Sequence, residues 1–126
     1  MEVAIGHLYR HAHLTEAVAR LIYEEFWKGD IYEEWLREVE KQNVDSSDEF
    51  RALVEQFYEK YPEQFTREYA ATNIHEDLAE SFEHFVLEPK PSGDGVVEQK
   101  IRFFYDFPEL IELRQTMIQN ICSYTQ

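Results

Sequence analysis

The chain has 126 residues, of which 44% are hydrophobic and 15% aromatic, so it can bury a core and is long enough for one domain. Four glycines and four prolines are too few for a disordered or loop-rich all-β chain. Its 12 basic and 26 acidic residues give a net charge of −14. This charge disfavours nucleic acid and anionic membranes as partners and favours a cationic partner or a divalent cation.

Other sequence features narrow the class of protein further. Cys122 is the only cysteine, which excludes an intramolecular disulfide and a thiolate zinc cluster, and we expect it to be a core thiol of the last helix. No run of 18 apolar residues is present, so no transmembrane helix is expected. The first residues lack the basic region and the apolar core of a signal peptide. We therefore expect a cytoplasmic protein, or a piece of a longer chain.

Residues 1–17 form a poorly defined N-terminal segment. The helical spacing of apolar residues begins at the end of this segment, near Thr15. The first predicted helix has an apolar stripe made of Val18, Leu21, Ile22 and Phe26. Gly29 suits the position just after this helix, and Asp30 suits the N-cap of the next. The second helix is predicted over residues 31–41.

A capping-box pattern of Ser46 and Glu49 opens the third predicted helix, residues 47–60. Its apolar stripe comprises Phe50, Leu53, Val54, Phe57 and Tyr61. Pro62 permits a short turn after this helix. Residues 66–72 are predicted as an irregular or extended connection to the fourth helix.

The fourth predicted helix, residues 74–87, carries the densest group of residue types that bind metals. Asn73 is a good N-cap, Glu76 can reach back to its amide, and Pro89 ends the helix. One face must be buried, because it carries Ile74, Leu78, Phe82 and Phe85. The opposite, polar face carries Glu76, Glu80, Glu83 and His84.

Residues 89–95 form the one clear loop, and they hold half of the prolines. A fifth helix is predicted over residues 96–105. Asp106 is the predicted cap of the last helix, with Pro108 close to its first position. The last helix carries Leu110, Ile111, Leu113, Met117, Ile118 and Ile121. The period is helical almost throughout, so we predict an all-α fold in which a single domain of five to six helices spans residues 1–126.

The run from Glu76 to Phe82, Glu-Asp-Leu-Ala-Glu-Ser-Phe, belongs to a stretch from Tyr69 to about Arg114 that shows a family resemblance. The stretch resembles the C-terminal part of a family of bacterial zinc metallopeptidases. These are gluzincin-type zincins that are distantly similar to the anthrax lethal factor catalytic domain. The resemblance covers most of the chain from about residue 18, through the segments Phe26-Trp27, Tyr32-Glu33-Glu34-Trp35-Leu36 and Tyr58-Glu59-Lys60-Tyr61-Pro62.

The resemblance implies a role for Glu80. In that family, two histidines of an H-E-x-x-H helix and a glutamate from a later helix hold zinc, and the motif's glutamate is the general base. By its position, Glu80 corresponds to the later glutamate ligand. This chain departs from the family because it contains no H-E-x-x-H. The resemblance therefore implies the C-terminal half of a metallopeptidase domain, truncated or evolved away from catalysis. Such a half would act on a peptide substrate only if the missing zinc helix were supplied.

His7 and His11 are the other candidate zinc ligands. Their H-x-x-x-H spacing places both imidazoles on one face if the segment is helical, and with Glu80 they would make a two-histidine, one-glutamate site. Leu8 stands where the general base belongs, so such a site could bind zinc but would not hydrolyse peptides efficiently. The alternative is that both histidines are incidental and that Glu80 is an exposed acid on a polar helix face.

The histidines of the fourth helix have simpler interpretations. His75 is expected to be a partly buried structural histidine. His84 lies close to Asp77 and Glu88 and is expected in a surface ion-pair cluster. Weak binding of a transition metal by Glu80 and His84 is the alternative.

Two functions follow from these observations. The first is a zinc metallopeptidase-like domain, incomplete and not catalytic on its own. The second is a non-catalytic acidic helical module, which is favoured by the missing H-E-x-x-H and by the charge of −14. An apolar patch left exposed on such a module would bind another protein or a second copy of the chain.

Overall fold

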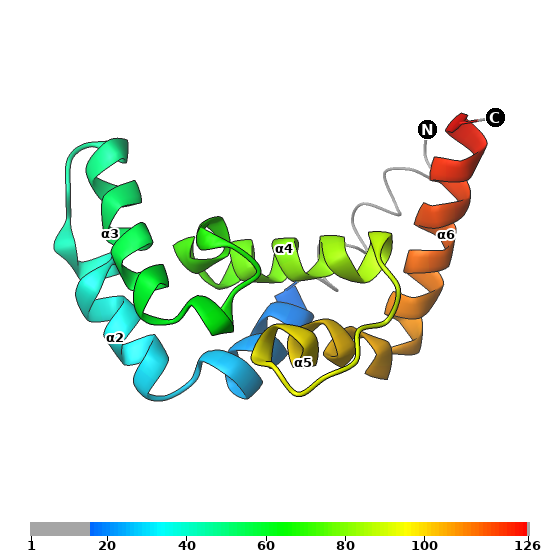
Figure 1. Ribbon diagram of the computed structural model, residues 1–126, viewed down its shortest axis with the longest axis horizontal. Coiled ribbons are helices and arrows are strands. Elements are labelled where there is room, and N and C mark those ends of the chain that lie inside the picture. The colour runs from blue at the N-terminus through cyan, green and yellow to red at the C-terminus, as the bar shows by residue number, and fades with distance from the viewer. Residues whose placement is uncertain (1–15, 126) are drawn as a thin grey trace.

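A computed structural model describes residues 16–125, and over that range the chain forms helices and no strand (Figure 1). The all-α prediction is confirmed. A helical segment over residues 16–22 is followed by η1 (Tyr23–Trp27), α2 (Asp30–Glu38), η2 (Glu40–Gln42), α3 (Ser47–Lys60), η3 (Pro62–Gln64), η4 (Glu68–Thr72), α4 (Ile74–Leu87), α5 (Val96–Phe103), η5 (Phe104–Asp106) and α6 (Pro108–Thr125). None of the helices over residues 16–125 has the length and apolar character needed to cross a membrane.

Helix α4 crosses the middle of the molecule. In Figure 1, α2 and α3 stand together at one end of α4, α6 rises at the other end, and α5 lies alongside it. Helix α4 packs against η4, α5 and α6. It is therefore the element that connects the two ends of the domain.

The sequence signals that start and orient α4 are confirmed. The Asn73 side chain accepts a hydrogen bond from the backbone N–H of Glu76 at 2.8 Å, which satisfies one of the free donors of the first turn. Leu78 and Phe85 are buried, and Ile74 and Phe82 pack against the same core. The predicted apolar stripe is thus the face that holds α4 to its neighbours.

Aromatic side chains make up much of the core on both sides of α4. Trp27 is buried and packs edge-on against Trp35, with ring centroids 5.8 Å apart, and against Phe65, with centroids 5.5 Å apart. At the α5 side, Phe85 and Phe104 are both buried, with centroids 5.4 Å apart. These rings bury a large apolar area per residue and so stabilise a domain of modest length.

The first helix changes its hydrogen-bond pattern before it ends. Residues 16–22 are α-helical, but Tyr23–Trp27 form a π-helical turn, and the N–H of Lys28 donates to the carbonyl of Tyr23 at 2.8 Å. The break that follows was predicted. The N-cap of α2 is Gly29 and not the predicted Asp30, which is the first residue of the helix. The φ of 111° at Gly29 lies in a region that glycine enters without strain, so the chain turns at this residue.

Four further boundaries differ from the predicted ones. Helix α5 ends at Phe103, and the 3-10 helix η5 contains its predicted last residues. Helix α2 ends at Glu38, and a 3-10 turn replaces its predicted last turn. The 3-10 helix η4 occupies most of the predicted irregular connection, because the small side chains of Ala70 and Ala71 are fully buried where η4 packs on α3 and α4. Asp106 is the last residue of η5 and not a cap, since α6 begins at Pro108.

Candidate functional site

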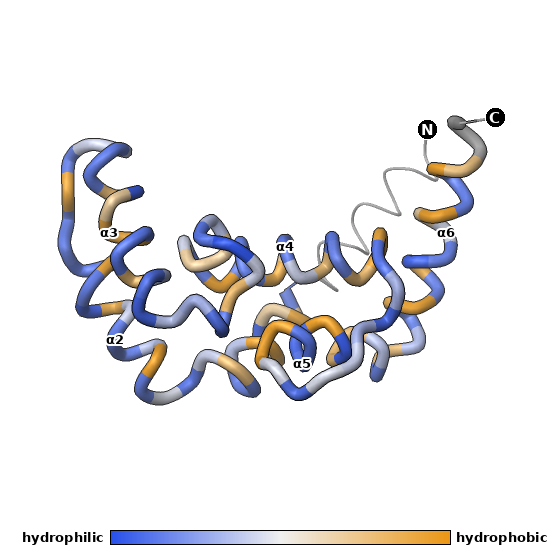
Figure 2. The backbone as a smooth tube through the Cα atoms, viewed as in Figure 1, coloured by the Kyte–Doolittle hydropathy of each residue, from blue (hydrophilic) through white to orange (hydrophobic). Residues whose placement is uncertain are grey.

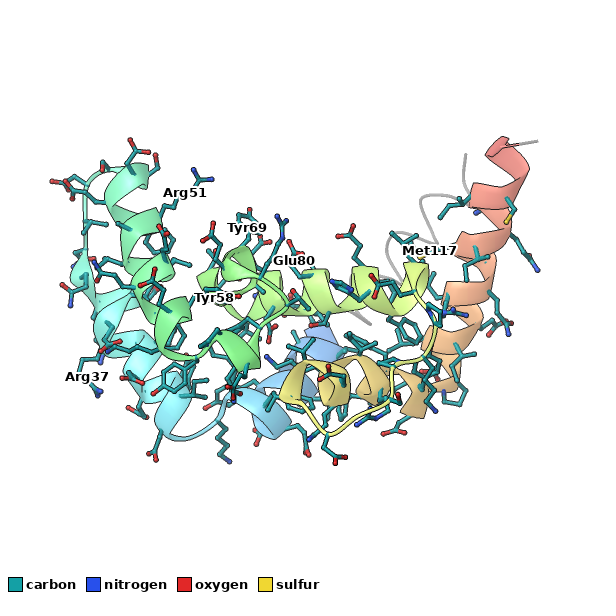
Figure 3. All side chains as sticks on the ribbon, viewed as in Figure 1. Arg37, Arg51, Tyr58, Tyr69, Glu80 and Met117 are labelled. Carbon is teal, nitrogen blue, oxygen red and sulfur yellow. The ribbon has the colours of Figure 1, made fainter. Side chains whose placement is uncertain are left out.

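Glu80 is buried on α4, and an arginine binds its carboxylate. Oε1 of Glu80 lies 2.6 Å from Nη2 of Arg67, which precedes η4. Glu80 is only 8% exposed, so the alternative that it is an exposed acid on a polar helix face is wrong. The reason is tertiary: η4 packs over this part of α4. Figure 3 shows Glu80 near Tyr69, which belongs to η4.

The Arg67 guanidinium is held from two sides. Glu80 contacts it by a charge-assisted hydrogen bond, and its Cζ atom lies 5.5 Å from the centroid of the Tyr69 ring. The hydrogen bond to Glu80 raises the pKa of Arg67, so the guanidinium stays charged. The negative charge of Glu80 is therefore already compensated, and a metal ion would have to compete with Arg67 for this carboxylate.

The other two predicted zinc ligands, His7 and His11, lie outside the described residues. Within residues 16–125, no three side chains of His, Cys, Asp or Glu are grouped so that they could hold a metal ion together. Zinc binding by Glu80 with His7 and His11 stays a prediction.

The two histidines of α4 lie on its surface. His75 is exposed, and its Nε2 lies 3.4 Å from Oε1 of Glu16, so the expectation of a partly buried structural histidine is wrong. His84 forms the expected surface pair with Glu88, with 2.8 Å between Nδ1 and Oε2. Asp77, the other carboxylate expected near His84, is fully buried and belongs to the core-facing side of α4.

Asp77 belongs to a charged pair in the core that the sequence did not reveal. Asp77 is 0% exposed and Lys100 of α5 is 2% exposed, and Oδ2 of Asp77 lies 2.8 Å from Nζ of Lys100. The same Oδ2 accepts a hydrogen bond from Nε1 of Trp27 at 2.8 Å. Lys100 also donates to the carbonyl of Gln64 and lies 4.5 Å from the centroid of the Phe65 ring. This pair links η1, η3, α4 and α5.

Burial controls the protonation of this pair. Removal from water raises the pKa of Asp77 and lowers the pKa of Lys100, because each charged form loses its hydration. Their mutual attraction opposes both shifts. The Ser81 hydroxyl, one helical turn after Asp77, also lowers the pKa of that carboxyl. Among the described residues, neither Ser81 Oγ nor Asp77 Oδ1 has a partner at hydrogen-bond distance and angle. Both charges are compensated only while these elements keep this arrangement, because either charge alone would be buried without its counter-charge.

Next to the C-terminal end of α4 lies an apolar hollow of about 470 Å³. We call it the apolar hollow; its lining comprises Val86, Leu87, Glu88, Pro89, Arg114, Ile118, Ile121 and Cys122. Leu87 is 59% exposed and Ile121 is 46% exposed, although both are large apolar residues. Figure 2 shows apolar residues recurring along α6 toward its C-terminal end. The thiol of Cys122 is exposed here, so the expectation of a core thiol is wrong.

A second hollow, of about 360 Å³, adjoins the first along α4. We call it the acidic hollow; its lining comprises Arg67, Glu80, Glu83, His84, Leu87 and Glu88. Leu87 and Glu88 line both hollows. The described surface of α4 thus changes from acidic to apolar within one helical turn.

The described residues define an all-α domain with a charged pair in its core and two adjoining hollows on its surface. Comparison of the chain with protein-family models, with curated proteins and with solved structures finds no match. The resemblance to zinc metallopeptidases accordingly stays a prediction from sequence motifs.

Proposed function

We propose that this chain is a metallopeptidase-like helical domain that does not hydrolyse peptides and that binds a protein partner through the apolar hollow. The observation that carries the proposal is the exposure of large apolar side chains at this place. Two of them, Leu87 at the end of α4 and Ile121 on α6, line the apolar hollow, and Met117 is a further exposed apolar residue of α6. Contiguous exposed apolar surface of this kind is typical of a site where another protein binds.

The environment of Glu80 supports the absence of catalysis. The sequence has no H-E-x-x-H, and Arg67 already binds the carboxylate that the resemblance assigns to zinc. We therefore expect no zinc-dependent hydrolysis of casein by the purified chain. Turnover that depends on zinc and is lost in Glu80→Gln would contradict this part of the proposal.

Site-specific crosslinking tests the interaction function. A photoreactive phenylalanine analogue placed at position 87 should give a discrete adduct in cells that produce the protein, because Leu87 lies at the edge of the apolar hollow. The same analogue at position 59 is the matched control, because Glu59 is exposed on α3, away from both hollows. If no adduct is specific to position 87, the proposed binding of a protein partner at the apolar hollow is rejected. An adduct with the mass of two chains would identify the partner as a second copy.

Zinc binding is a second candidate function, favoured by the burial of Glu80 on α4. In this proposal Glu80 holds zinc together with His7 and His11. Equilibrium dialysis at micromolar zinc should then show binding that is lost in Glu80→Gln and in His11→Ala. Arg67→Met should strengthen binding, because it removes the cation that competes for Glu80. If neither the parent protein nor Arg67→Met retains zinc, this candidate is rejected.

A further inference from the structure

The residues that line the two hollows indicate which chemical groups a binding partner would carry. They share Leu87 and Glu88, so a segment lying along α4 would contact both. Glu83 precedes Leu87 by four residues, which on a helix corresponds to a rise of about 6 Å. An apolar side chain in the apolar hollow and a polar one in the acidic hollow would therefore be about one helical turn apart in the partner.

The acidic hollow carries excess negative charge. Three carboxylates line it, those of Glu80, Glu83 and Glu88, against the single guanidinium of Arg67. Glu80 is bound by Arg67, and Glu88 is paired with His84. Glu83 is exposed and makes no ion pair or side-chain hydrogen bond with another residue in the described part of the chain, although its charge helps to raise the pKa of Arg67 across the hollow. Glu83 is thus the carboxylate best placed to accept a cationic group from outside.

We infer that the partner is a basic amphipathic helix, which inserts apolar side chains into the apolar hollow and places a Lys or Arg against Glu83. This inference rests on the proposed interaction function and specifies its partner. Charge complementarity supports a basic partner, because the acidic hollow attracts a cationic side chain. The short distance between the two hollows supports a helix, because an amphipathic helix bound in a groove inserts side chains at i, i+3 or i+4 and i+7. A second copy fits poorly, since each copy carries a net charge of −14 and would bring acidic rims together.

Two designed peptides with the same leucine face test this inference. One carries lysines on its polar face and the other carries glutamates, and fluorescence anisotropy measures the binding of each to the full chain. We expect the lysine peptide to bind about tenfold more tightly or better. Glu83→Lys should weaken binding of the lysine peptide about tenfold and should strengthen binding of the glutamate peptide.

Matched variants separate a local contact from general attraction to an acidic protein. Glu59→Lys changes the net charge by the same amount as Glu83→Lys, but Glu59 lies on α3, so its effect should stay within about twofold. Leu87→Ser should abolish binding of the lysine peptide. Leu21→Ser, at another exposed leucine, should leave binding unchanged. Circular dichroism and urea unfolding show that each variant keeps its fold.

Each contrary outcome has a distinct meaning. Equal effects of Glu83→Lys and Glu59→Lys would overturn the inference, because the attraction would then belong to the whole surface. If both peptides bind equally and Leu87→Ser abolishes both, the apolar hollow is a docking site but its partner is not basic. If neither peptide binds, the inference fails, and the crosslink at position 87 decides separately whether the proposed function stands.

Discussion

The ion pair between Lys100 and Asp77 should make the free energy of unfolding of this domain sensitive to the loss of either partner. Both lie in the core, where no water compensates a charge that loses its partner. Lys100→Met should therefore destabilise the protein by about 3 kcal/mol, since it leaves the carboxyl of Asp77 without its counter-charge. The double variant with Asp77→Asn should be less destabilised than Lys100→Met alone. Urea unfolding measures both, with Lys41→Met as the exposed control. A loss below about 0.5 kcal/mol for Lys100→Met would contradict this account.

Glu34 and Tyr61 form a hydrogen bond between α2 and the end of α3 that should respond to pH. The bond from the Tyr61 hydroxyl lowers the pKa of Glu34, and the same bond raises the pKa of Tyr61. Its stabilisation is thus present above the pKa of an unfolded glutamate, about 4.3, and is lost as the pH falls through the lower folded value. At the alkaline side it is present below about pH 10 and is lost as the pH rises through the raised value for Tyr61.

Tyr61→Phe should accordingly lower the urea midpoint by a constant amount between about pH 5 and pH 9. The difference from the parent protein should shrink as the pH falls below the pKa of an unfolded glutamate, about 4.3, because the pKa of Glu34 in the folded protein is lowered by this hydrogen bond. Tyr58→Phe is the control, because Tyr58 is a neighbouring half-buried tyrosine of the same helix whose ring packs on Phe65. A difference that does not change with pH would show that Glu34 is not the acceptor that matters.

Single residues were the hardest features to predict from the sequence. Helical spacing placed Leu78 and Phe85 correctly, because burial of an apolar stripe is a local property. Asp77 falls between Ile74 and Ser81 on the buried side of α4, and that position was the only signal of its role. Its partner Lys100 lies on another helix, so the pair could not be derived from periodicity. The burial of Glu80 under η4 is a tertiary effect of the same kind.

Capping is the clearest interaction at the scale of elements. Asn73→Ala removes the side-chain acceptor for the N–H of Glu76 and should cost about 1 kcal/mol of stability, measured by urea unfolding. Asn73→Asp keeps an acceptor at this position and should stay within a few tenths of a kcal/mol of the parent protein. An unchanged midpoint in Asn73→Ala would mean that the first turn of α4 is stabilised by its packing alone.

Some element boundaries were predicted and others were not: the caps expected at Asp30 and Asp106 are not formed, whereas the ends of α3 and α4 lie where they were expected. The caps at Ser46 and Asn73 are formed as expected, because a cap depends on residues three positions apart. The end of α2 and the 3-10 helix η4 were missed, because packing against other elements decides them. Ala70 and Ala71 carry little local signal, yet their small size lets η4 approach both α3 and α4.

At the scale of the whole molecule, net charge acts on stability through repulsion. With 26 acidic and 12 basic residues, the folded chain concentrates like charges that salt screens over about 10 Å at 0.1 M. Raising sodium chloride from low to moderate concentration should therefore raise the thermal midpoint, as followed by circular dichroism. A fall with added salt would show that local pairs such as Lys60–Glu38 outweigh the general repulsion.

The fold class and the candidate site differ in how far the sequence determined them. The helical period over most of the chain was sufficient to predict an all-α domain. The candidate zinc ligand Glu80 came from a motif, and only the structure showed Arg67 beside it. The apolar hollow also needed the structure, because Leu87 and Ile118 come from different helices.

The π-helical turn Tyr23–Trp27 behaves as one extra residue inserted into a helix. Deletion of Glu24 or Glu25 would remove that extra residue, and the segment could then form a regular α-helix with Trp27 still directed at Asp77, because a π-helical turn holds one residue more than an α-helical turn. Such a deletion should therefore keep the native tryptophan emission and change the urea midpoint little. A large loss of the midpoint, or a tryptophan emission shifted to that of the unfolded protein, would contradict this account of the turn. The helix can thus change its length by one residue at this turn without moving Trp27 away from Asp77.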